Sequence, residues 1–307
     1  MAITRRQFIA TVAAAGAVSS GIGVDGFLVE PERVAISRLR LATGASAGAS
    51  AGTGARPGDS AATVTFVHLS DLHLQEVQSH ERRVAAAVNA LAPDFVVITG
   101  DSIDRRDKLP QLHDFLALLD ARTPKFAILG NWEHACRVDL HALARVYAAA
   151  NCRLLINETA IYTHGIIRVL ITGLDDLLEG RANVAGALAG IEPEPNHLIL
   201  AHCPVHWDVL RYVRPPSGNR WSGLRPQDAA VFQRFAPTCV LSGHTHGGQV
   251  NFFGFAPWRP RGSGRYISGW YRDVEPALYV SRGIGTIDLP IRIGAAPEVA
   301  RFEWVLA

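Results

Sequence analysis

Short apolar runs alternate with longer helical patterns through most of this 307-residue chain, and this alternation narrows its fold more than any other feature. Apolar runs of about four to eight residues are typical of buried strands, whereas apolar residues at every third or fourth position are typical of helices. Their alternation predicts an α/β domain in which helices cover sheets. The expected strands are 33–41, 64–67, 95–98, 126–129, 169–171, 198–200, 239–241, 278–280 and 299–305, and the expected helices lie near 79–91, 109–120, 138–150, 205–213 and 227–234.

Two further patterns refine this picture of the domain. Residues 157–168 read as a hairpin that turns at His164 and Gly165, so part of the sheet is expected to be antiparallel. Residues 42–61 are almost all small, which predicts a flexible loop. Because a strand pattern already precedes this loop, we expect it to interrupt one domain that spans residues 30–307.

The N-terminus carries a pattern of a different kind. Arg5 and Arg6 precede an apolar, small-residue run from Phe8 to about Val24, which is typical of a twin-arginine export signal. Residues 1–29 are therefore expected to be an export signal or an N-terminal anchor. The twin-arginine export machinery would carry the protein across the cytoplasmic membrane, to the periplasm or to the outer face of that membrane. Residues 17–19 form a tolerable cleavage site, and an uncleaved segment would anchor the protein to the membrane.

Composition excludes some classes of protein and partner. With 48% hydrophobic and 19% charged residues, most of the chain has the composition of a globular protein. A formal net charge of +2 does not indicate nucleic acid or an anionic membrane surface as a partner. The four cysteines form no Cys-x-x-Cys pair, so we expect buried thiols rather than a zinc knuckle or a redox motif.

Polar side chains that bind metals follow the expected strands at the points where the strands end. In extended backbone, His244 and His246 project to the same side roughly 6–7 Å apart, which suits ligands of one metal or of two adjacent metals. Taken alone, a carboxylate at such an exit could cap a helix, and a histidine could belong to the core. The full set is Asp71 and His73, Asp101, Asn131, His202, and the pair His244 and His246. His206, four residues past His202, could face the same site.

The ordered set D-x-H, G-D, G-N, H and G-H-x-H resembles the calcineurin-like metallophosphoesterase superfamily. The resemblance runs from about residue 62 to 305, and the segments 281–285, 289–292 and 297–299 look like the C-terminal part of an exported phosphodiesterase branch. It implies a four-layer α/β/β/α sandwich of two mixed β-sheets flanked by helices. Five motifs in one order are specific, although each alone would be weak.

The resemblance also implies a role for each of these residues. Asp71, His73 and His246 would bind one divalent ion, Asn131, His202 and His244 a second, and Asp101 would bridge the two. A shared carboxylate holds two cations roughly 3.5–4 Å apart, where they activate a water for in-line attack on phosphorus. Imidazoles beside carboxylates and an amide suit Mn, Zn or Fe, which the sequence does not distinguish.

One position departs from the superfamily pattern. The residue after the asparagine is usually a histidine that protonates the leaving oxygen, but here it is Trp132. Loss of a general acid costs on the order of 10²–10⁴-fold in rate. We predict that His134, in the same loop, takes the catalytic role.

The sequence therefore predicts an exported binuclear-metal phosphohydrolase, most simply a phosphodiesterase. The expected substrate is a phosphodiester or a phospho-sugar or phospholipid small molecule. An alternative is a metal-retaining but catalytically weak scaffold of the cell envelope, and a third is a phosphomonoesterase or nucleotide hydrolase. Aromatic residues with interleaved arginines would form either a substrate rim or ordinary packing: Trp207, Trp221, Trp258, Trp270 and Tyr271, with Arg220, Arg225, Arg259 and Arg261.

Overall fold

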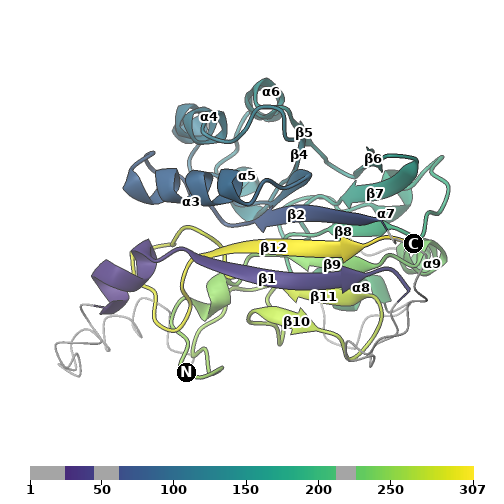
Figure 1. The fold of residues 1–307 in the computed structure, drawn as a ribbon. Coiled ribbons are helices and arrows are strands. Elements are labelled where there is room, and N and C mark those ends of the chain that lie inside the picture. Colours follow the sequence, from purple (N-terminus) through teal and green to yellow (C-terminus); the bar gives the residue numbers. More distant parts are fainter. Residues whose placement is uncertain (1–24, 45–61, 212–225) are drawn as a thin grey trace.

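Two six-stranded sheets form the centre of the computed structural model, which describes residues 25–44, 62–211 and 226–307 (Figure 1). The first sheet has the strand order β1 (Ala35–Ala42), β12 (Glu298–Val305), β2 (Thr63–Leu69), β3 (Phe95–Thr99), β4 (Lys125–Ile128) and β5 (Cys152–Leu154). The second has the order β10 (Gly269–Tyr271), β11 (Ala277–Val280), β9 (Cys239–Ser242), β8 (His197–Leu200), β7 (Ile167–Gly173) and β6 (Glu158–His164).

Both sheets mix parallel and antiparallel pairs. Strands β2 to β5 run parallel to one another, as do β7, β8, β9 and β11, whereas β12 is antiparallel to β2 and β6 is antiparallel to β7. The predicted hairpin is thus the β6–β7 pair, although its turn lies one residue later than expected, between His164 and Ile167.

Helices cover the outer face of each sheet. The first sheet is covered by α3 (Ser79–Ala90), α4 (Leu109–Ala117) and α6 (Leu140–Ala149), and the second by α7 (Val184–Ala187), α8 (Val205–Arg211) and α9 (Pro226–Phe235). Shorter elements are η1 (Asp25–Val29), η2 (Glu30–Glu32), η3 (Arg106–Lys108), α5 (Asn131–Ala135) and η4 (His246–Gly248). The predicted α/β/β/α sandwich is confirmed.

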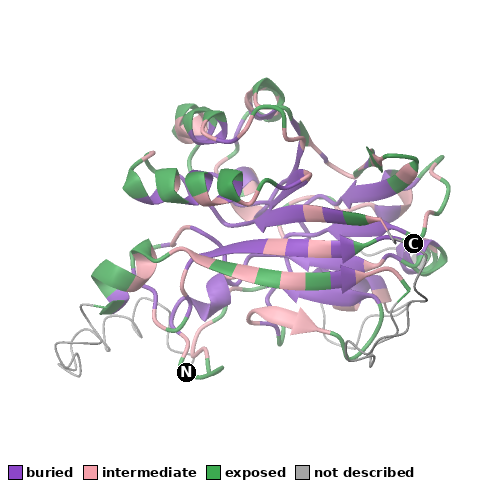
Figure 2. Cartoon of the chain, viewed as in Figure 1, coloured by how far each residue is buried: buried purple, intermediate pink, exposed green. Residues whose placement is uncertain are grey.

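The period of two along the strands divides the core into layers. In β3, Val96 and Ile98 pack against the helices, whereas Phe95 and Val97 face the second sheet. Between the sheets the Phe66 ring stacks on Phe95 and Phe302, with centroid separations of 5.0 and 4.6 Å. Figure 2 shows the result: buried residues line the strands, and the helices of the first sheet turn exposed residues outward.

The structure adds short elements that the sequence patterns did not predict. The sequence patterns did not indicate β5, β10, α5 or α7, because the two strands have only three residues and helices of four or five residues are too short to show a period. Strands β1 and β2 lie in one sheet with β12 between them, on either side of the small-residue segment. That segment, from residue 45 to 61, the end of the 205–213 helix and the twin-arginine signal with its cleavage site lie outside the described residues.

Two remaining expectations concern the cysteines and the membrane. All four cysteines are free thiols, and three of them are buried, whereas Cys136 is half-buried. Within the described ranges, no helix has both the length and the apolar character that a membrane span requires.

Candidate metal centre

The predicted ligands come from strand ends that meet at one edge of the two sheets. Strands β2, β3 and β4 of the first sheet end just before Asp71, Asp101 and Asn131, and β8 and β9 of the second end just before His202 and His244. Backbone hydrogen bonds tie the exits together: Asp71 N–H donates to Gly100 O, and Gly243 N–H donates to His202 O. The parallel strand order thus gathers residues that are far apart in the sequence.

Six of the seven predicted ligands form two buried triads. Asp71, His73 and His246 make the first triad, and Asp101, His202 and His244 make the second. In each triad the three ligand atoms all lie within 4.8 Å of one another. Asn131 completes the set, because its Oδ1 lies 3.1 Å from His202 Nε2.

Asp101 belongs to the second triad and also faces the first. Its Oδ2 is 3.0 Å from His202 Nε2 in the second triad and 3.7 Å from His73 Nε2 in the first. Its Oδ1 accepts a hydrogen bond of 2.9 Å from the backbone N–H of Trp132. One oxygen therefore faces both groups of histidines while the other is fixed by the loop of the neighbouring strand.

The backbone at the centre is strained. Five of the seven predicted ligands have positive φ angles, from 44° at His73 to 71° at His244. Such angles are uncommon for residues other than glycine and persist only where the surrounding structure enforces them. Neighbouring glycines allow the close approach: a Cβ on Gly243 would lie 2.3 Å from Asp71 Oδ2. The strained backbone lowers the stability of the fold, but it holds these side chains close together.

Hydrogen bonds select which ring nitrogen each histidine turns toward the centre. His202 Nδ1 donates to Thr99 O at 2.7 Å, so its Nε2 is left for Asp101 and Asn131. His244 uses its ring nitrogens the other way round from His202: its Nε2 donates to Arg261 O at 2.7 Å, and its Nδ1 faces His202. Such outer hydrogen bonds are the usual means by which proteins orient metal-binding imidazoles.

Burial and the charges of neighbouring residues shift the pKa values of the triad residues, upward for some and downward for others. Burial raises the pKa of Asp71 to about 6 and lowers that of His244 to about 4, since both groups are out of water. Burial would also raise the pKa of Asp101, but the charge of His202 and its hydrogen bond bring it down to about 2. Burial disfavours the charged form of His202, yet the carboxylate of Asp101 raises its pKa well above the usual range. The centre thus contains strongly coupled anionic and cationic groups.

The residues present fit a divalent transition metal at each triad. Two ring nitrogens face each other at 3.2 Å in each triad, His73 Nε2 with His246 Nε2 and His244 Nδ1 with His202 Nε2. Metal–nitrogen bonds of about 2.0–2.1 Å place neighbouring ligand atoms roughly 3 Å apart around one ion. Imidazole and carboxylate donors, excluded from water, are the set that such ions prefer.

Glu133 supports the centre and was not identified from the sequence. Its buried carboxylate accepts hydrogen bonds from the backbone N–H groups of Asp101, Ser102 and Gly130, at 3.1, 2.6 and 2.9 Å. It therefore joins the loop after β3 to the loop after β4. Glu133 lies two residues after the predicted ligand Asn131, and this proximity could have marked it as a candidate site residue. Its backbone partners, however, are set by the fold.

The structure turns His134 toward a carboxylate rather than into either triad. His134 Nε2 lies 2.7 Å from Asp175 Oδ1, and the Asp175 carboxylate also accepts from the backbone N–H groups of Asp176 and Arg181. The hydrogen bond to Asp175 raises the pKa of His134 although partial burial opposes it. Asp175 follows β7, so the rule of polar residues at strand exits, applied to this strand, would have found it.

Trp132 lies between the predicted ligand Asn131 and the supporting residue Glu133 in the sequence. Its ring meets His73 edge to face, with centroids 6.1 Å apart and an interplanar angle of 86°. Because Asn131 begins α5, the helix places Trp132 toward the first triad, while Asn131 contacts the second. The two neighbours thus serve different halves of the centre.

Two of the aromatic residues that were expected to form either a substrate rim or ordinary packing are packed within the fold. Trp207 is buried, and its Nε1 donates to Pro276 O, whereas Trp270 packs against Tyr279 and Phe302. Trp221, Arg220 and Arg225 lie outside the described residues. His206 is buried on α8, and burial lowers its pKa to about 4, but it belongs to neither triad.

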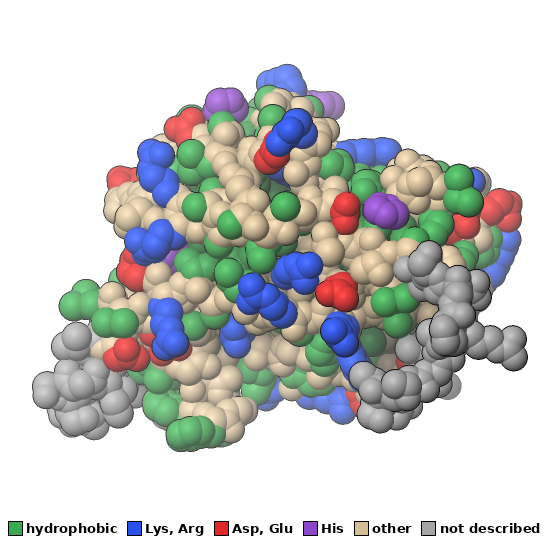
Figure 3. Space-filling model, viewed as in Figure 1, with side chains coloured by type: hydrophobic (Ala, Val, Ile, Leu, Met, Phe, Trp, Pro, Cys, Tyr) green, Lys and Arg blue, Asp and Glu red, His purple; other side chains and the backbone are tan. Residues whose placement is uncertain are grey.

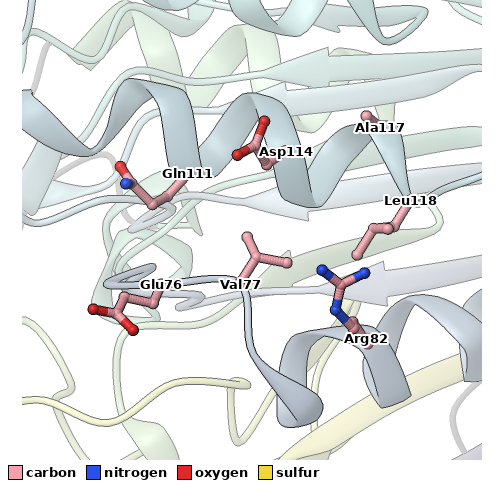
Figure 4. A pocket seen from close by; sticks show the side chains of 7 residues that line it. All are labelled: Glu76, Val77, Arg82, Gln111, Asp114, Ala117 and Leu118. Atoms are coloured by element: carbon pink, nitrogen blue, oxygen red, sulfur yellow. The ribbon is translucent and has the colours of Figure 1, made fainter.

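A pocket of about 500 Å³ lies elsewhere, between α4 and the segment that leads into α3 (Figure 4). Side chains of mixed character line it, and none of them is a predicted site residue. They are Glu76, Val77, Arg82, Gln111, Asp114, Ala117 and Leu118.

Comparisons with known proteins agree with this geometry. Residues 64–248 match the model of the calcineurin-like phosphoesterase family. The chain is 27% identical to the uncharacterized metallophosphoesterase YkoQ of Bacillus subtilis (strain 168), over 77% of this chain and 82% of that protein. It is 29% identical to YkuE, an uncharacterized metallophosphoesterase of the same organism, over 77% of each chain. It is 27% identical to phosphodiesterase YaeI of Escherichia coli (strain K12), over 99% of this chain and 100% of that protein. The chain therefore belongs to the calcineurin-like phosphoesterase family and is a metal-dependent phosphoesterase.

Proposed function

We propose that this protein is an exported phosphodiesterase that holds two divalent ions, Mn, Zn or Fe. The observation that carries the proposal is the position of Asp101, one oxygen of which faces both triads. Asp71, His73 and His246 would hold one ion, Asn131, His202 and His244 the other, and Asp101 both. When bound, the pair of cations would clamp a phosphoryl group and stabilise charge on the attacking and leaving oxygens.

The export and substrate parts of the proposal have separate support. Arg5 and Arg6 ahead of an apolar run support export by the twin-arginine machinery, with membrane association if the segment stays uncleaved. That machinery passes folded proteins, so metal loading before export is compatible with the signal. The likeness to a protein named phosphodiesterase, along the whole chain, favours diesters over monoesters.

A substrate panel tests the reaction class directly. We expect the protein loaded with Mn or Zn to hydrolyse an aryl phosphodiester faster than an aryl monoester or a nucleotide. Metal content is measured on the same samples. Faster monoester or nucleotide hydrolysis would overturn the diesterase assignment, and full metal occupancy with no hydrolysis of any class would favour a binding scaffold.

We further propose that His134 protonates the leaving oxygen, with Asp175 as its positioning residue. In the imidazolium form, Nε2–H is bonded to Asp175 and the proton on Nδ1 is the one available for transfer. His134→Ala is expected to lower turnover of an alkyl diester by on the order of 10²–10⁴-fold. An aryl diester should lose far less, because an aryl oxide leaves without protonation.

The pH profile gives the second readout for His134. The hydrogen bond to Asp175 raises the pKa of His134, so the proton-donating form persists to higher pH and activity falls as pH rises through that raised value. Asp175→Asn should move this basic limb to lower pH while metal content stays constant. Equal losses on alkyl and aryl diesters, or an unmoved limb, would rule out the assignment.

A further inference from the structure

An exposed aromatic turn lies a short distance along the chain from the metal centre. Phe252 and Phe255 pair as an antiparallel bridge, with hydrogen bonds in both directions at 2.9 and 3.0 Å. Phe253 and Gly254 form the turn between them, with φ angles of 53° and 93°. These angles match a type I′ turn, whose two central residues both need positive φ.

The residue at the tip of this turn is unusual. Asparagine, aspartate and glycine are preferred at the first central position of such a turn, and a bulky side chain there is an outlier. Phe253 is nevertheless fully exposed, at 108%, and Phe255 is 68% exposed. The fold therefore bears both backbone strain and an exposed aromatic ring at one position, a combination that points to a role outside the folded core.

A second apolar segment lies beside the turn. In η1, Phe27, Leu28 and Val29 are 37%, 69% and 48% exposed. The strip 291–294 joins the two segments, because Arg292 N–H donates to Gly26 O and Asn251 N–H donates to Ile293 O. We call these six residues, three from each segment, the apolar patch. Figure 3 shows hydrophobic side chains at the left margin and at the lower edge of the molecule, in the region of η1 and the neighbouring loops, with charged side chains between the two groups.

We propose that the apolar patch docks the folded domain onto the lipid bilayer, with Phe253 entering the acyl boundary. Large apolar side chains that are exposed in groups mark an interaction site. Three observations favour a bilayer as the occupant. The patch itself has no charged side chain, its tip projects as a turn, and η1 directly continues residues 8–24, a run without charge.

The charges around the patch specify the kind of lipid contact. Asp25 and Glu30 flank the η1 side, and Glu32 there pairs with Arg83, so this side has no excess of positive charge and attraction to anionic lipid headgroups is not what would hold the domain there. Binding would rest on burial of aromatic and aliphatic side chains at the interface, as in interfacial helices with a strong apolar face. We therefore expect little dependence on salt or on anionic lipid.

Docking in this way would bring the proposed centre near the membrane. Six steps along the chain separate His246 from Phe252, so their Cα atoms are at most about 20 Å apart. This inference goes beyond the proposed hydrolysis and beyond anchoring by the N-terminal segment. It concerns the folded domain and would stand even if the substrate class proved different.

Quenching of tryptophan fluorescence by lipids tests the proposal in the full chain. Residues 1–24 contain no tryptophan, so the measurement is valid even if that segment also binds the vesicles. Phe253→Trp is compared with the unchanged protein on phosphatidylcholine vesicles that carry brominated acyl chains. We expect roughly half or more of the added emission to be quenched, because an interfacial side chain sits about 5–10 Å into the headgroup boundary. Quenching should be similar with phosphatidylglycerol present and at raised salt.

Ile166→Trp is the matched control. Ile166 is 99% exposed in the turn between β6 and β7, and its added emission should stay unquenched. In Figure 1 these two strands lie at the opposite end of the molecule from the N-terminal helical segment that precedes β1. A binding variant gives a second readout: Phe253→Asn suits the positive φ, so the fold is retained while vesicle affinity falls roughly 10-fold.

Three outcomes would overturn the proposal. Unquenched emission at position 253 on protein-bound vesicles would mean that the N-terminal segment alone provides attachment. Blue-shifted but unquenched emission with concentration-dependent sedimentation would assign the patch to a second copy of the chain. Quenching that appears only with anionic lipid and disappears at raised salt would assign the contact to charge.

Discussion

Replacing Asp101 by alanine is expected to remove most bound metal from both triads at once. The reason is its position: one carboxylate oxygen lies 3.0 Å from His202 and 3.7 Å from His73, which belong to different triads. A metal pair that clamps phosphorus supplies several kcal/mol of transition-state stabilisation, so diester hydrolysis should fall on the order of 10³-fold or more. Elemental analysis of the purified variant measures the metal, and an aryl diester measures the rate.

Two further variants separate the bridging role from structural damage. Asp101→Asn keeps an oxygen that can accept from the Trp132 N–H but removes the negative charge, and it should lose metal as well. Asp107→Ala removes an exposed carboxylate farther along the same loop, which pairs only with Arg105 among the contacts described, and it should keep both metal and rate. Two ions retained by Asp101→Ala would contradict the assignment of a shared ligand.

Replacing Arg292 by methionine is expected to cost roughly 3–5 kcal/mol of unfolding free energy. Arg292 is fully buried, and its guanidinium donates to the carbonyl oxygens of Arg282, Ala295 and Gly285. Burial lowers the pKa of Arg292 to about 10, so it remains charged at neutral pH. Methionine would leave the carbonyls of Arg282 and Ala295 without this donor, at roughly 1–3 kcal/mol each before relaxation, and the Gly285 carbonyl with His246 alone. Urea unfolding measures the loss.

The same substitution should also weaken metal binding at the first triad. The Gly285 carbonyl that Arg292 holds is the acceptor for His246 Nδ1, at 3.3 Å, and this bond directs His246 Nε2 toward Asp71 and His73. Loss of such outer partners typically lowers metal affinity about 10–100-fold. Arg292→Lys should recover part of the stability, and Arg122→Met, at a side chain that is 92% exposed, should change neither property. Unchanged stability of Arg292→Met would refute the argument.

The layered fold was predictable because its signals are local. Strands such as β3 and β8 are short apolar runs, and α3 and α6 show helical periodicity, so the α/β/β/α class followed from the alternation and the resemblance. The strand β5 was missed because it has only three residues, and the helix α7 because four residues are too few to show a helical period. Pairing order was also beyond reach: β12, the last strand, lies between β1 and β2 through contacts across the whole chain.

The site was partly predictable for a related reason. Its predicted ligands occur at strand exits in a recognisable order, and the structure brings all seven together. Glu133 was missed because its partners are backbone N–H groups that only the folded loops bring near. Asp175 follows β7 and could have been identified as a polar residue at a strand exit, but its contact with His134 is set by the fold. The Trp132 position was visible as a departure, but its edge-on contact with His73 was not.

The sequence alone determined which chemical groups this protein has and where its strands end, since composition and local periodicity carry that information. It also determined the absence of a histidine at position 132. Only the tertiary structure decided which groups meet. It brought the two ligand groups that the resemblance implied to either side of one Asp101 oxygen, and it chose Nδ1 of His244 but Nε2 of His202. It also turned His134 to Asp175 and linked the Phe253 turn to η1 through residues 291–294. These outcomes depend on register and on hydrogen bonds between distant residues, which no local pattern encodes.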